Sequence, residues 1–309
     1  MADNAHSQTS SANVQTTGHV WDGDLQEYNN PLPLWWIYGL YVTMLFALVY
    51  WFVYPSWPIG KSFLPGTGEV VYVNAQGQEE SWHWNTRAKL LKEMQEGAAA
   101  QKPYYDKLMG MSYEAIAKDP ELSSFVLSAG KAVFSENCAA CHQSGGGGKL
   151  GFFPNLTDDD WMYGGSFEKI HQTISQGRRG YMPGFAEALD KEQIESLASY
   201  VLSLSGNKVD ANKAAKGDQL FHSHTAACFY CHGDDGKGRQ DIGSANLTDK
   251  VWLWADVPSA TDDVSKLAAV KNVISAGLAK GVMPAWDGRI KPEQMKLLTV
   301  YVHELGGGK

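Results

Sequence analysis

All four cysteines of this chain lie in two copies of one short pattern, Cys-x-x-Cys-His, which restricts the fold more than any other feature of the sequence. The first copy reads CAACH at residues 138–142, and the second reads CFYCH at residues 228–232. A cysteine pair followed directly by a histidine presents two thiols and one imidazole within about one helical turn. The two copies therefore predict two similar binding sites, each built on a short segment.

Four uses of these cysteines compete. A disulfide within one motif would close a small strained ring and would leave the histidine unexplained. A redox-active pair belongs beside a βαβ pattern, which the sequence lacks, and a zinc site of four cysteines would also leave both histidines idle. Covalent haem c uses every residue, through two thioether bonds and an iron ligand from the histidine. We therefore predict two covalently bound haem c groups, attached at Cys138, Cys141, Cys228 and Cys231.

The two motifs lie in an internal repeat that extends from residue 130 to residue 307. Asn-Leu-Thr-Asp-x-x-Trp occurs at 155–161 and again at 246–252, and Met-Pro occurs at 182–183 and 283–284. Each unit has about 75–90 residues, a size at which a core of side chains alone is marginal. A bound cofactor is one of the additions that stabilise domains of this size.

The remaining iron ligands are expected on the two Met-Pro loops. His142 and His232 supply one axial ligand each, and Met182 and Met283 recur at matching places, where the following proline fixes the loop. The other histidines of the repeat have no counterpart in the second unit and are interpreted as surface or core residues: His171, His222, His224 and His303. The spacing allows each methionine to serve the haem of its own unit or, in a crossed pairing, that of the other.

Each unit is expected to close by packing its last helix against its first. Apolar residues within 194–202 and within 295–305 recur on one helical face. Gly130 and Gly217 lack side chains, so the first helix of each unit can cross the last helix closely. The aromatic pairs expected at these crossings are Phe134 with Tyr200, and Phe221 with Tyr301.

One segment is apolar enough to cross a membrane. Residues 35–54 carry no charge, and a helix of that length is roughly 30 Å long, the thickness of the hydrocarbon core. A cleaved signal peptide would need a basic residue before it and a small-residue cleavage site after it. A buried soluble helix fits poorly with so long an apolar run between prolines. Aromatic residues stand near both ends, as at membrane interfaces: Trp35, Trp36, Tyr50, Trp51, Tyr54 and Trp57.

The sequence thus predicts a mainly α-helical chain with one N-terminal transmembrane helix followed by two tandem cytochrome c-type domains. The expected parts are an N-terminal segment at 1–34, an anchor at 35–57, a linker at 58–125, and cytochrome c domains at 126–208 and 209–309. Within the linker, residues 68–77 indicate a short strand or hairpin. A helix is expected to follow from about residue 85 and to stop near Lys102, because Pro103 comes next. No catalytic constellation is found there.

The formal net charge is −8, and no basic stripe indicates nucleic acid as a partner. An acidic surface is better suited to a basic protein partner. Charge says little about the orientation of the anchor. No Lys or Arg precedes Lys61, which follows the anchor and weakly favours placing that side in the cytoplasm.

The repeat, from residue 130 to residue 307, resembles a tandem pair of class I cytochromes c. The stretch TTGHVWDGDLQEYNNPLPLWW at 16–36, followed by one anchor and two haem motifs, resembles the CcoP/FixP subunit of cbb3-type cytochrome c oxidases. Leu34 departs from that family, in which a basic residue often precedes the tryptophans, and this removes a cue to orientation.

The resemblance implies a dihaem electron-transfer subunit that is not catalytic alone. Such a subunit takes electrons from a periplasmic donor cytochrome c and passes them toward a multi-span catalytic subunit that reduces oxygen and pumps protons. A monohaem cytochrome c subunit is a further implied partner. Because bacteria attach haem c on the outer side of the cytoplasmic membrane, the haem domains are expected in the periplasm and the N-terminus in the cytoplasm.

Two other classes of function remain open. The first is a membrane-anchored dihaem carrier, resembling cytochrome c4 or the cytochrome subunit of a dehydrogenase, and co-purification with a multi-span subunit would separate it from an oxidase subunit. The second is a dihaem peroxidase, which needs an open iron position, whereas both units here offer a methionine to close it.

Overall fold

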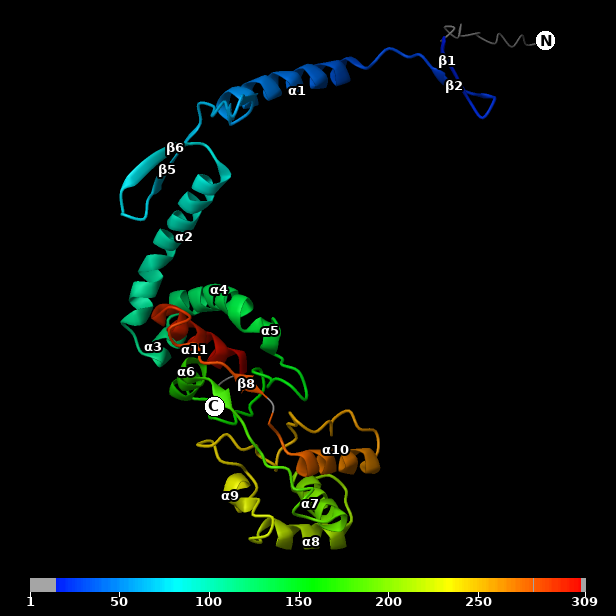
Figure 1. The fold of residues 1–309 in the computed structure, drawn as a ribbon, viewed down its shortest axis with the longest axis vertical. Helices are drawn as coiled ribbons and strands as arrows, with labels where there is room; N and C mark the ends of the chain where they lie inside the picture. The colour runs from blue at the N-terminus through cyan, green and yellow to red at the C-terminus, as the bar shows by residue number, and fades with distance from the viewer. Residues whose placement is uncertain (1–14, 280, 307–309) are drawn as a thin grey trace, which may run out of the picture. The chain divides into compact units, whose positions relative to one another are not determined.

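A computed structural model of the chain describes residues 15–279 and 281–306, and the chain divides into two compact units at residues 1–100 and 101–309. The first fourteen residues of the segment expected at 1–34, His6 among them, lie outside the described residues, as do residues 307–309 at the end of the second repeat. The described chain is mostly helical, and its strands form four separate antiparallel pairs (Figure 1). This confirms the mainly α-helical class predicted from the sequence.

The first unit consists of hairpins around one long apolar helix. Its elements are β1 (Thr16–Trp21), β2 (Leu25–Tyr28), α1 (Leu34–Val53), β3 (Pro58–Ile59), β4 (Ser62–Phe63), β5 (Glu69–Val73), β6 (Glu79–His83) and the first part of α2 (Thr86–Met109). Among the described residues, α1 is the one helix long and apolar enough to span a membrane, and none of its residues is buried. A helix that is apolar all round and exposed all round requires an apolar solvent, so its composition fits a membrane anchor.

Helix α2 runs through Pro103, so the helix end expected near Lys102 is wrong. Proline inside a helix costs about 3 kcal/mol, because it removes a hydrogen bond and its ring clashes with the preceding turn. The helical turns of α2 beyond Pro103 are stabilised by the packing of their side chains. Leu108 is fully buried, and the rings of Tyr104 and Tyr105 lie 4.9 and 5.2 Å from that of Phe125. Burial of these side chains offsets the cost of the proline.

The second unit contains most of the helices. Its elements after α2 are α3 (Tyr113–Lys118), α4 (Pro120–Asn137), α5 (Ala139–His142), α6 (Phe167–Gln176), β7 (Arg178–Arg179), α7 (Lys191–Leu204), α8 (Ala211–Phe221), α9 (Phe229–His232), α10 (Asp263–Ala276), β8 (Val282–Met283) and α11 (Pro292–Gly306). Their starts follow the capping rules of isolated helices. The side chain of Asp190, for example, accepts a hydrogen bond from the backbone N–H of Gln193, and the side-chain oxygen of Gln193 accepts one from the backbone N–H of Asp190.

The helices form two cores, and each core combines helices from both repeats (Figure 1). In the first core, α4 and α6 of the first repeat pack with α11, the last helix of the second repeat. In the second core, α7, the last helix of the first repeat, packs with α8 and α10 of the second. The terminal helices are therefore exchanged. The repeats at 126–208 and 209–309 describe the sequence, and each three-dimensional core draws on both.

The exchange makes the expected aromatic pairs wrong. Phe134 lies 5.5 Å from Tyr301, between ring centroids, and Phe221 lies 5.2 Å from Tyr200, where the sequence suggested the opposite partners. The reason is that both repeats carry the same apolar pattern on their first and last helices, so each last helix can pack on either first helix.

The two glycines are at close crossings, as expected, although with exchanged partners. A Cβ atom on Gly130 would lie 2.8 Å from the Cβ of Tyr301 on α11. On Gly217 it would lie 2.0 Å from the carbonyl oxygen of Ser196 on α7. Helices α7 and α8 can approach this closely only where no side chain intervenes.

A cluster of charges also ties the second core together. Glu195 of α7 binds Lys213 of α8, and its other oxygen lies 2.7 Å from Lys271 Nζ of α10. The hydrogen bonds to these two lysines lower the pKa of Glu195 to about 2. A carboxylate that joins three helices fixes their relative rotation, although at the surface each such pair stabilises the fold only modestly.

Candidate haem sites

Both histidines of the Cys-x-x-Cys-His motifs have one ring nitrogen engaged and leave the other for a metal. His142 Nδ1 lies 3.1 Å from the carbonyl oxygen of Pro154, and His232 Nδ1 lies 2.9 Å from that of Ala245. Donation from Nδ1 to a carbonyl fixes the tautomer in which Nε2 carries a free lone pair. Burial lowers the pKa of both imidazoles, and the carbonyl contact opposes it. Each motif therefore presents a fixed, partly buried imidazole donor.

Glycines make room for the carbonyls that hold these rings. The backbone N–H of Gly148 donates to His142 O at 3.0 Å, and that of Gly238 donates to His232 O at 2.8 Å. Both glycines have φ near +70°, at 64° and 77°. A Cβ on Gly148 would lie 2.4 Å from Pro154 O, the acceptor of the histidine bond. The glycine-rich loop after each motif thus brings the chain back beneath the histidine.

All four cysteines are free thiols, and the two motifs present them in the same way. Cys138 and Cys228 are partly buried against the first and the second core respectively, whereas Cys141 and Cys231 are exposed. Burial raises the pKa of the Cys138 thiol and of the Cys228 thiol to about 11. One thiol turned into the core and one at its surface suit attachment along two points of one planar ligand.

The structure brings each Met-Pro loop to the core of the other repeat's motif. Met283 packs against the first core, as does Cys138, the residue that directly follows α4. Met182 packs against the second core, together with Cys228. Both side chains are partly buried. Of the two pairings that the sequence allowed, the packing favours the crossed one, in which Met283 serves the motif of His142 and Met182 serves that of His232.

The two loops reach these places by crossing each other in a short antiparallel arrangement. In the pair of β7 and β8, Arg178 stands opposite Met283. Met182 and Leu278 exchange both backbone hydrogen bonds at 2.8 Å, and so stand opposite each other as well. Glycines permit the contact, because a Cβ on Gly177 would lie 2.4 Å from Met283 O.

Two buried donors without partners point to an anion at the first site. Among the described residues, Trp161 Nε1 and Arg178 Nε are the buried side-chain nitrogens or oxygens that lack a hydrogen bond. Trp161 packs against the first core, and Arg178 is the cross-strand neighbour of Met283. Buried polar groups are normally paired. Haem carries carboxylate groups that would satisfy such donors, so the residues present fit a haem at this site.

At the equivalent position of the second site, a leucine replaces the arginine. The residue opposite Met182 is Leu278, in the position that Arg178 holds opposite Met283. The guanidinium of Arg178 lies 4.7 Å from the ring centre of Tyr163, which keeps it in place. A fixed positive charge disfavours a further positive charge nearby, and the effect is larger away from water. Arg178 therefore adds a positive charge beside the first site that Leu278 does not supply at the second.

Carboxylates of the two Asn-Leu-Thr-Asp segments gather beside the sites. Burial raises the pKa of Asp160 to about 6, and the negative charges of Asp249 and Asp158 add to the effect. Asp249 belongs to the second repeat, so the matching segments of the two repeats lie near each other. Together with the crossed loops, this places the two candidate sites side by side within the unit formed by residues 101–309.

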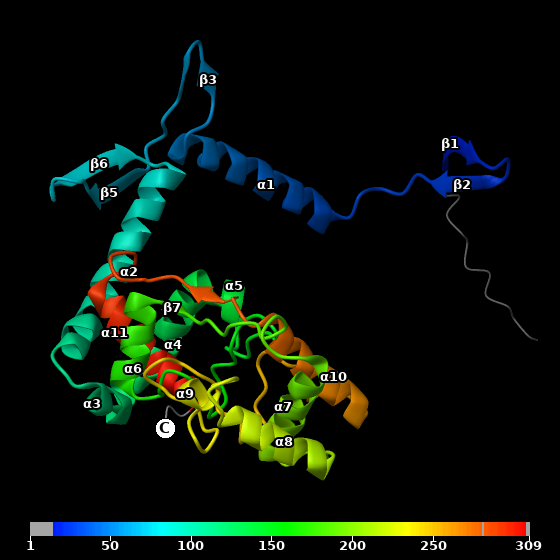
Figure 2. The same cartoon turned by 60° about the horizontal axis from the view of Figure 1, so that its bottom comes forward.

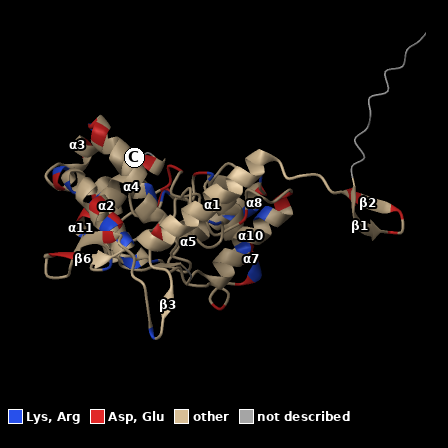
Figure 3. Ribbon diagram, turned by 90° about the horizontal axis from the view of Figure 1, so that it is seen from above, with Lys and Arg blue, Asp and Glu red and all other residues tan. Residues whose placement is uncertain are grey.

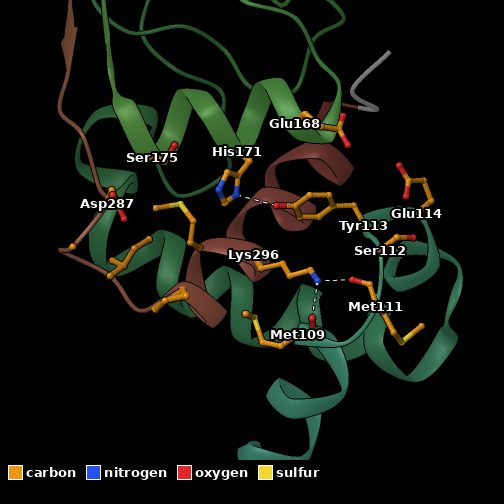
Figure 4. Close-up of a pocket in the computed structure, with 14 residues that line it drawn as sticks. Met109, Met111, Ser112, Tyr113, Glu114, Glu168, His171, Ser175, Asp287 and Lys296 are labelled. Atoms are coloured by element: carbon orange, nitrogen blue, oxygen red, sulfur yellow. Dashed lines mark hydrogen bonds between the residues drawn. The ribbon is translucent and has the colours of Figure 1, made fainter.

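A cavity outside the two motifs is a separate feature. It has a volume of about 510 Å³ and lies between α3, α6 and α11, and none of its lining residues belongs to a haem motif or a Met-Pro loop (Figure 4). Lys296 crosses it and donates to the carbonyl oxygens of Met109, at 3.2 Å, and Met111. Tyr113 OH lies 2.9 Å from His171 Nδ1. These contacts fasten the linker to the first core.

Sequence reasoning missed two of the site residues. The repeated Asn-Leu-Thr-Asp-x-x-Trp motif marks Trp161, which recurs as Trp252, but the motif alone does not indicate what the side chain does. Nothing in the sequence marks Arg178, because its counterpart Leu278 breaks the repeat. His171, interpreted as a surface or core residue, lies half-buried on α6 with its Nδ1 in contact with Tyr113 OH of α3.

Comparison with known proteins gives matches along nearly the whole chain. Residues 13–61 match the family described as the N-terminal domain of cytochrome oxidase-cbb3, FixP, and residues 126–201 and 212–302 match cytochrome C oxidase, cbb3-type, subunit III. Cbb3-type cytochrome c oxidase subunit FixP of Azorhizobium caulinodans is 41% identical, over 95% of this chain and 94% of that protein. FixP of Bradyrhizobium diazoefficiens is 41% identical, over 98% and 99%. Subunit CcoP of Cereibacter sphaeroides is 37% identical, over 95% of each.

Proposed function

The chain belongs to the FixP/CcoP family of cbb3-type cytochrome c oxidase subunits, and on that premise we propose that it carries electrons from a donor cytochrome c to the oxygen-reducing subunit of such an oxidase. The observation that carries the proposal is the pair of Cys-x-x-Cys-His turns, each with a fixed imidazole and a methionine packed against the same core. The family membership favours an oxidase subunit over the stand-alone carrier that the sequence left open.

The proposed cofactors are two haem c groups, one on each motif. Cys138 and Cys141 would hold the first haem, with His142 and Met283 as its iron ligands. The second would be held by the corresponding residues, Cys228, Cys231, His232 and Met182. Bound haem supplies one-electron redox chemistry at its iron. The chain contributes the ligand set, and a His/Met pair holds the potential of a haem higher than harder ligands do.

With these side chains as ligands, both axial positions of each haem would be occupied, and oxygen would find no site at either iron. The residues of the chain would hold the two haems within one unit, each beside one of the two cores. A haem at each motif would let the chain take up an electron from a donor and pass it on to a membrane partner. Arg178 at the first site and Leu278 at the second give the two centres different surroundings.

The proposed partners are a multi-span catalytic subunit, a monohaem cytochrome c subunit and a donor cytochrome c. Helix α1 anchors the chain in the bacterial inner membrane, with the haem-bearing unit in the periplasm, where haem c is attached. The net charge of −8 suits a basic donor.

Reduction of oxygen should require the complete oxidase. The isolated chain, supplied with a reduced donor cytochrome, should become reduced without taking up oxygen, whereas the membrane complex should take up oxygen steadily. An oxygen electrode and the absorption of the haems, recorded together, measure both quantities. Sustained, cyanide-sensitive uptake by the isolated chain would show that the proposed role is wrong.

Two haems should be bound per polypeptide, and both should resist organic extraction and denaturing electrophoresis, because thioether bonds survive these treatments. Quantitative haem analysis against protein concentration measures the ratio. The variant Cys228→Ala/Cys231→Ala is the matched control and should hold one haem. A ratio of one in the unaltered chain, or haem that can be extracted, would contradict the assignment.

Proteolysis of intact spheroplasts should release a soluble haem-containing fragment. A single anchor at α1 leaves both motifs on one side of the membrane, and the linker between residues 58 and 125 offers exposed sites for cleavage. Haem staining of the supernatant and N-terminal sequencing of the fragment identify the cut. If the haem units stay protected until the cells are opened, the orientation is the reverse of the one proposed.

A further inference from the structure

The hairpin that follows α1 exposes a cluster of large apolar side chains. Trp57, Ile59, Phe63 and Leu64 are 53, 57, 48 and 43% exposed, and they lie on or beside the two strands β3 and β4. The one charged residue of the hairpin is Lys61, at the turn between the strands. In Figure 3 the loop that carries β3 is uncharged except for a blue tip. Exposed apolar clusters of this kind mark surfaces that meet another phase or a partner.

The hairpin is fixed to the end of the apolar helix. Ser56 N–H donates to Leu64 O at 3.1 Å, and the next segment returns to the last turn of α1, where Gly68 N–H donates to Val53 O at 2.8 Å. The rings of Trp51 and Trp57 lie 4.9 Å apart, nearly edge to face. Figure 2 shows the hairpin projecting from the end of α1. The depth of the hairpin in a membrane would therefore follow the depth of α1.

The length of α1 sets that depth. Twenty uncharged residues span roughly 30 Å, the thickness of the hydrocarbon core, so Val53 lies at the boundary between acyl chains and headgroups. The hairpin starts within a few residues of this boundary. Trp side chains are favoured at this level, and a lysine there can bury its stem while its ammonium reaches the phosphates.

We propose that residues 56–64 form a membrane-seated hairpin, in which Trp57, Ile59 and Phe63 enter the headgroup–acyl boundary and Lys61 binds anionic lipid phosphate. The hairpin surface is continuous with the lipid-facing surface of α1, and its apolar side chains around one cation match the composition of interfacial elements. It fixes the depth and the rotation of the anchor. The inference rests on the membrane anchor and is independent of the haem ligands.

Spin labels on single cysteines in the full haem-containing chain test the proposal. Ile59→Cys places the label on the hairpin, and Gln76→Cys, at the exposed turn between β5 and β6, is the matched control in the same unit. The chain is reconstituted in vesicles of phosphatidylcholine with phosphatidylglycerol. Power saturation should show the label at 59 colliding more with lipid-soluble oxygen, and the label at 76 colliding more with a water-soluble nickel complex.

Three outcomes decide between the possible surroundings of the hairpin. Equal collision with the nickel complex at 59 and 76 would overturn the proposal, because the hairpin would be in water. A label at 59 that is immobilised and shielded from both agents in the assembled oxidase would also overturn it, because another subunit would cover the hairpin. The added change Lys61→Glu should move the label at 59 toward water in vesicles that contain anionic lipid. It should have little effect in vesicles of pure phosphatidylcholine. Equal effects in the two kinds of vesicle would refute the contact between Lys61 and anionic lipid phosphate.

Discussion

Replacing Met283 with alanine should remove the thioether ligand from the haem on Cys138 and Cys141, although Met283 belongs to the other sequence repeat. The reason is the packing of Met283 against the first core and its place opposite Arg178. Axial ligands set haem potentials over a range of about 0.8 V, so loss of the methionine should lower the potential of this centre substantially. Potentiometric titration and near-infrared magnetic circular dichroism measure the change.

The control for this prediction is Met109→Ala, a change at an exposed methionine that lies at the end of α2. It should leave both haem spectra and both potentials unaltered. If Met283→Ala also leaves the haem spectra and potentials unaltered, then Met283 only fills space in the first core. Its replacement would then lower the stability of the fold and nothing else.

Gly217→Ala should destabilise the haem-bearing unit strongly. A Cβ at this position would lie 2.0 Å from Ser196 O and 2.6 Å from Ser196 C, which are backbone atoms that cannot turn aside. Helices α7 and α8 would have to separate along the second core, and we expect a loss of about 3 kcal/mol or more in the free energy of unfolding. Urea denaturation followed by circular dichroism measures the loss in the detergent-solubilised chain.

Gly180→Ala is the matched control, because a Cβ on Gly180 would meet nothing within 4 Å and its backbone does not have a left-handed φ. It should change the unfolding free energy by no more than about 0.5 kcal/mol. A Gly217→Ala variant as stable as Gly180→Ala would contradict the close α7–α8 crossing on which the exchanged arrangement depends.

The sequence predicted the local features well, because local chemistry determines them. The apolar run at 35–54 became α1 at Leu34–Val53, and Asp190 caps α7 as its side chain requires. The Cys-x-x-Cys-His motifs indicated haem c, which the family membership supports, whereas Met182 and Met283 as iron ligands stay a prediction. Each of these inferences depends on a few neighbouring residues and on no long-range packing.

The exchange of helices could not be predicted, because the two repeats are nearly equivalent. Phe134 and Phe221 stand at matching positions, as do Tyr200 and Tyr301, so either pairing satisfies the same apolar pattern. In the structure, the exchanged helix pairing goes together with the crossing of the two Met-Pro loops. There the backbone of Met182 pairs with that of Leu278, and the backbone of Arg178 with that of Met283. Such backbone pairing between distant segments leaves no periodic signal. Helix α2 continues through Pro103 for a related reason. The packing of the residues after Pro103 against the first core outweighs the local preference of proline to end a helix.

The most direct test of the crossed ligation is a chain with one haem. In Cys228→Ala/Cys231→Ala only the haem on Cys138 and Cys141 remains, and Met182→Ala or Met283→Ala is added to it. Magnetic circular dichroism of the remaining haem then reports whether a thioether still binds the iron. We predict that Met283→Ala abolishes the thioether signal and that Met182→Ala preserves it. Loss of the signal with Met182→Ala, and its retention with Met283→Ala, would show that each repeat ligates its own haem and would contradict the crossed arrangement.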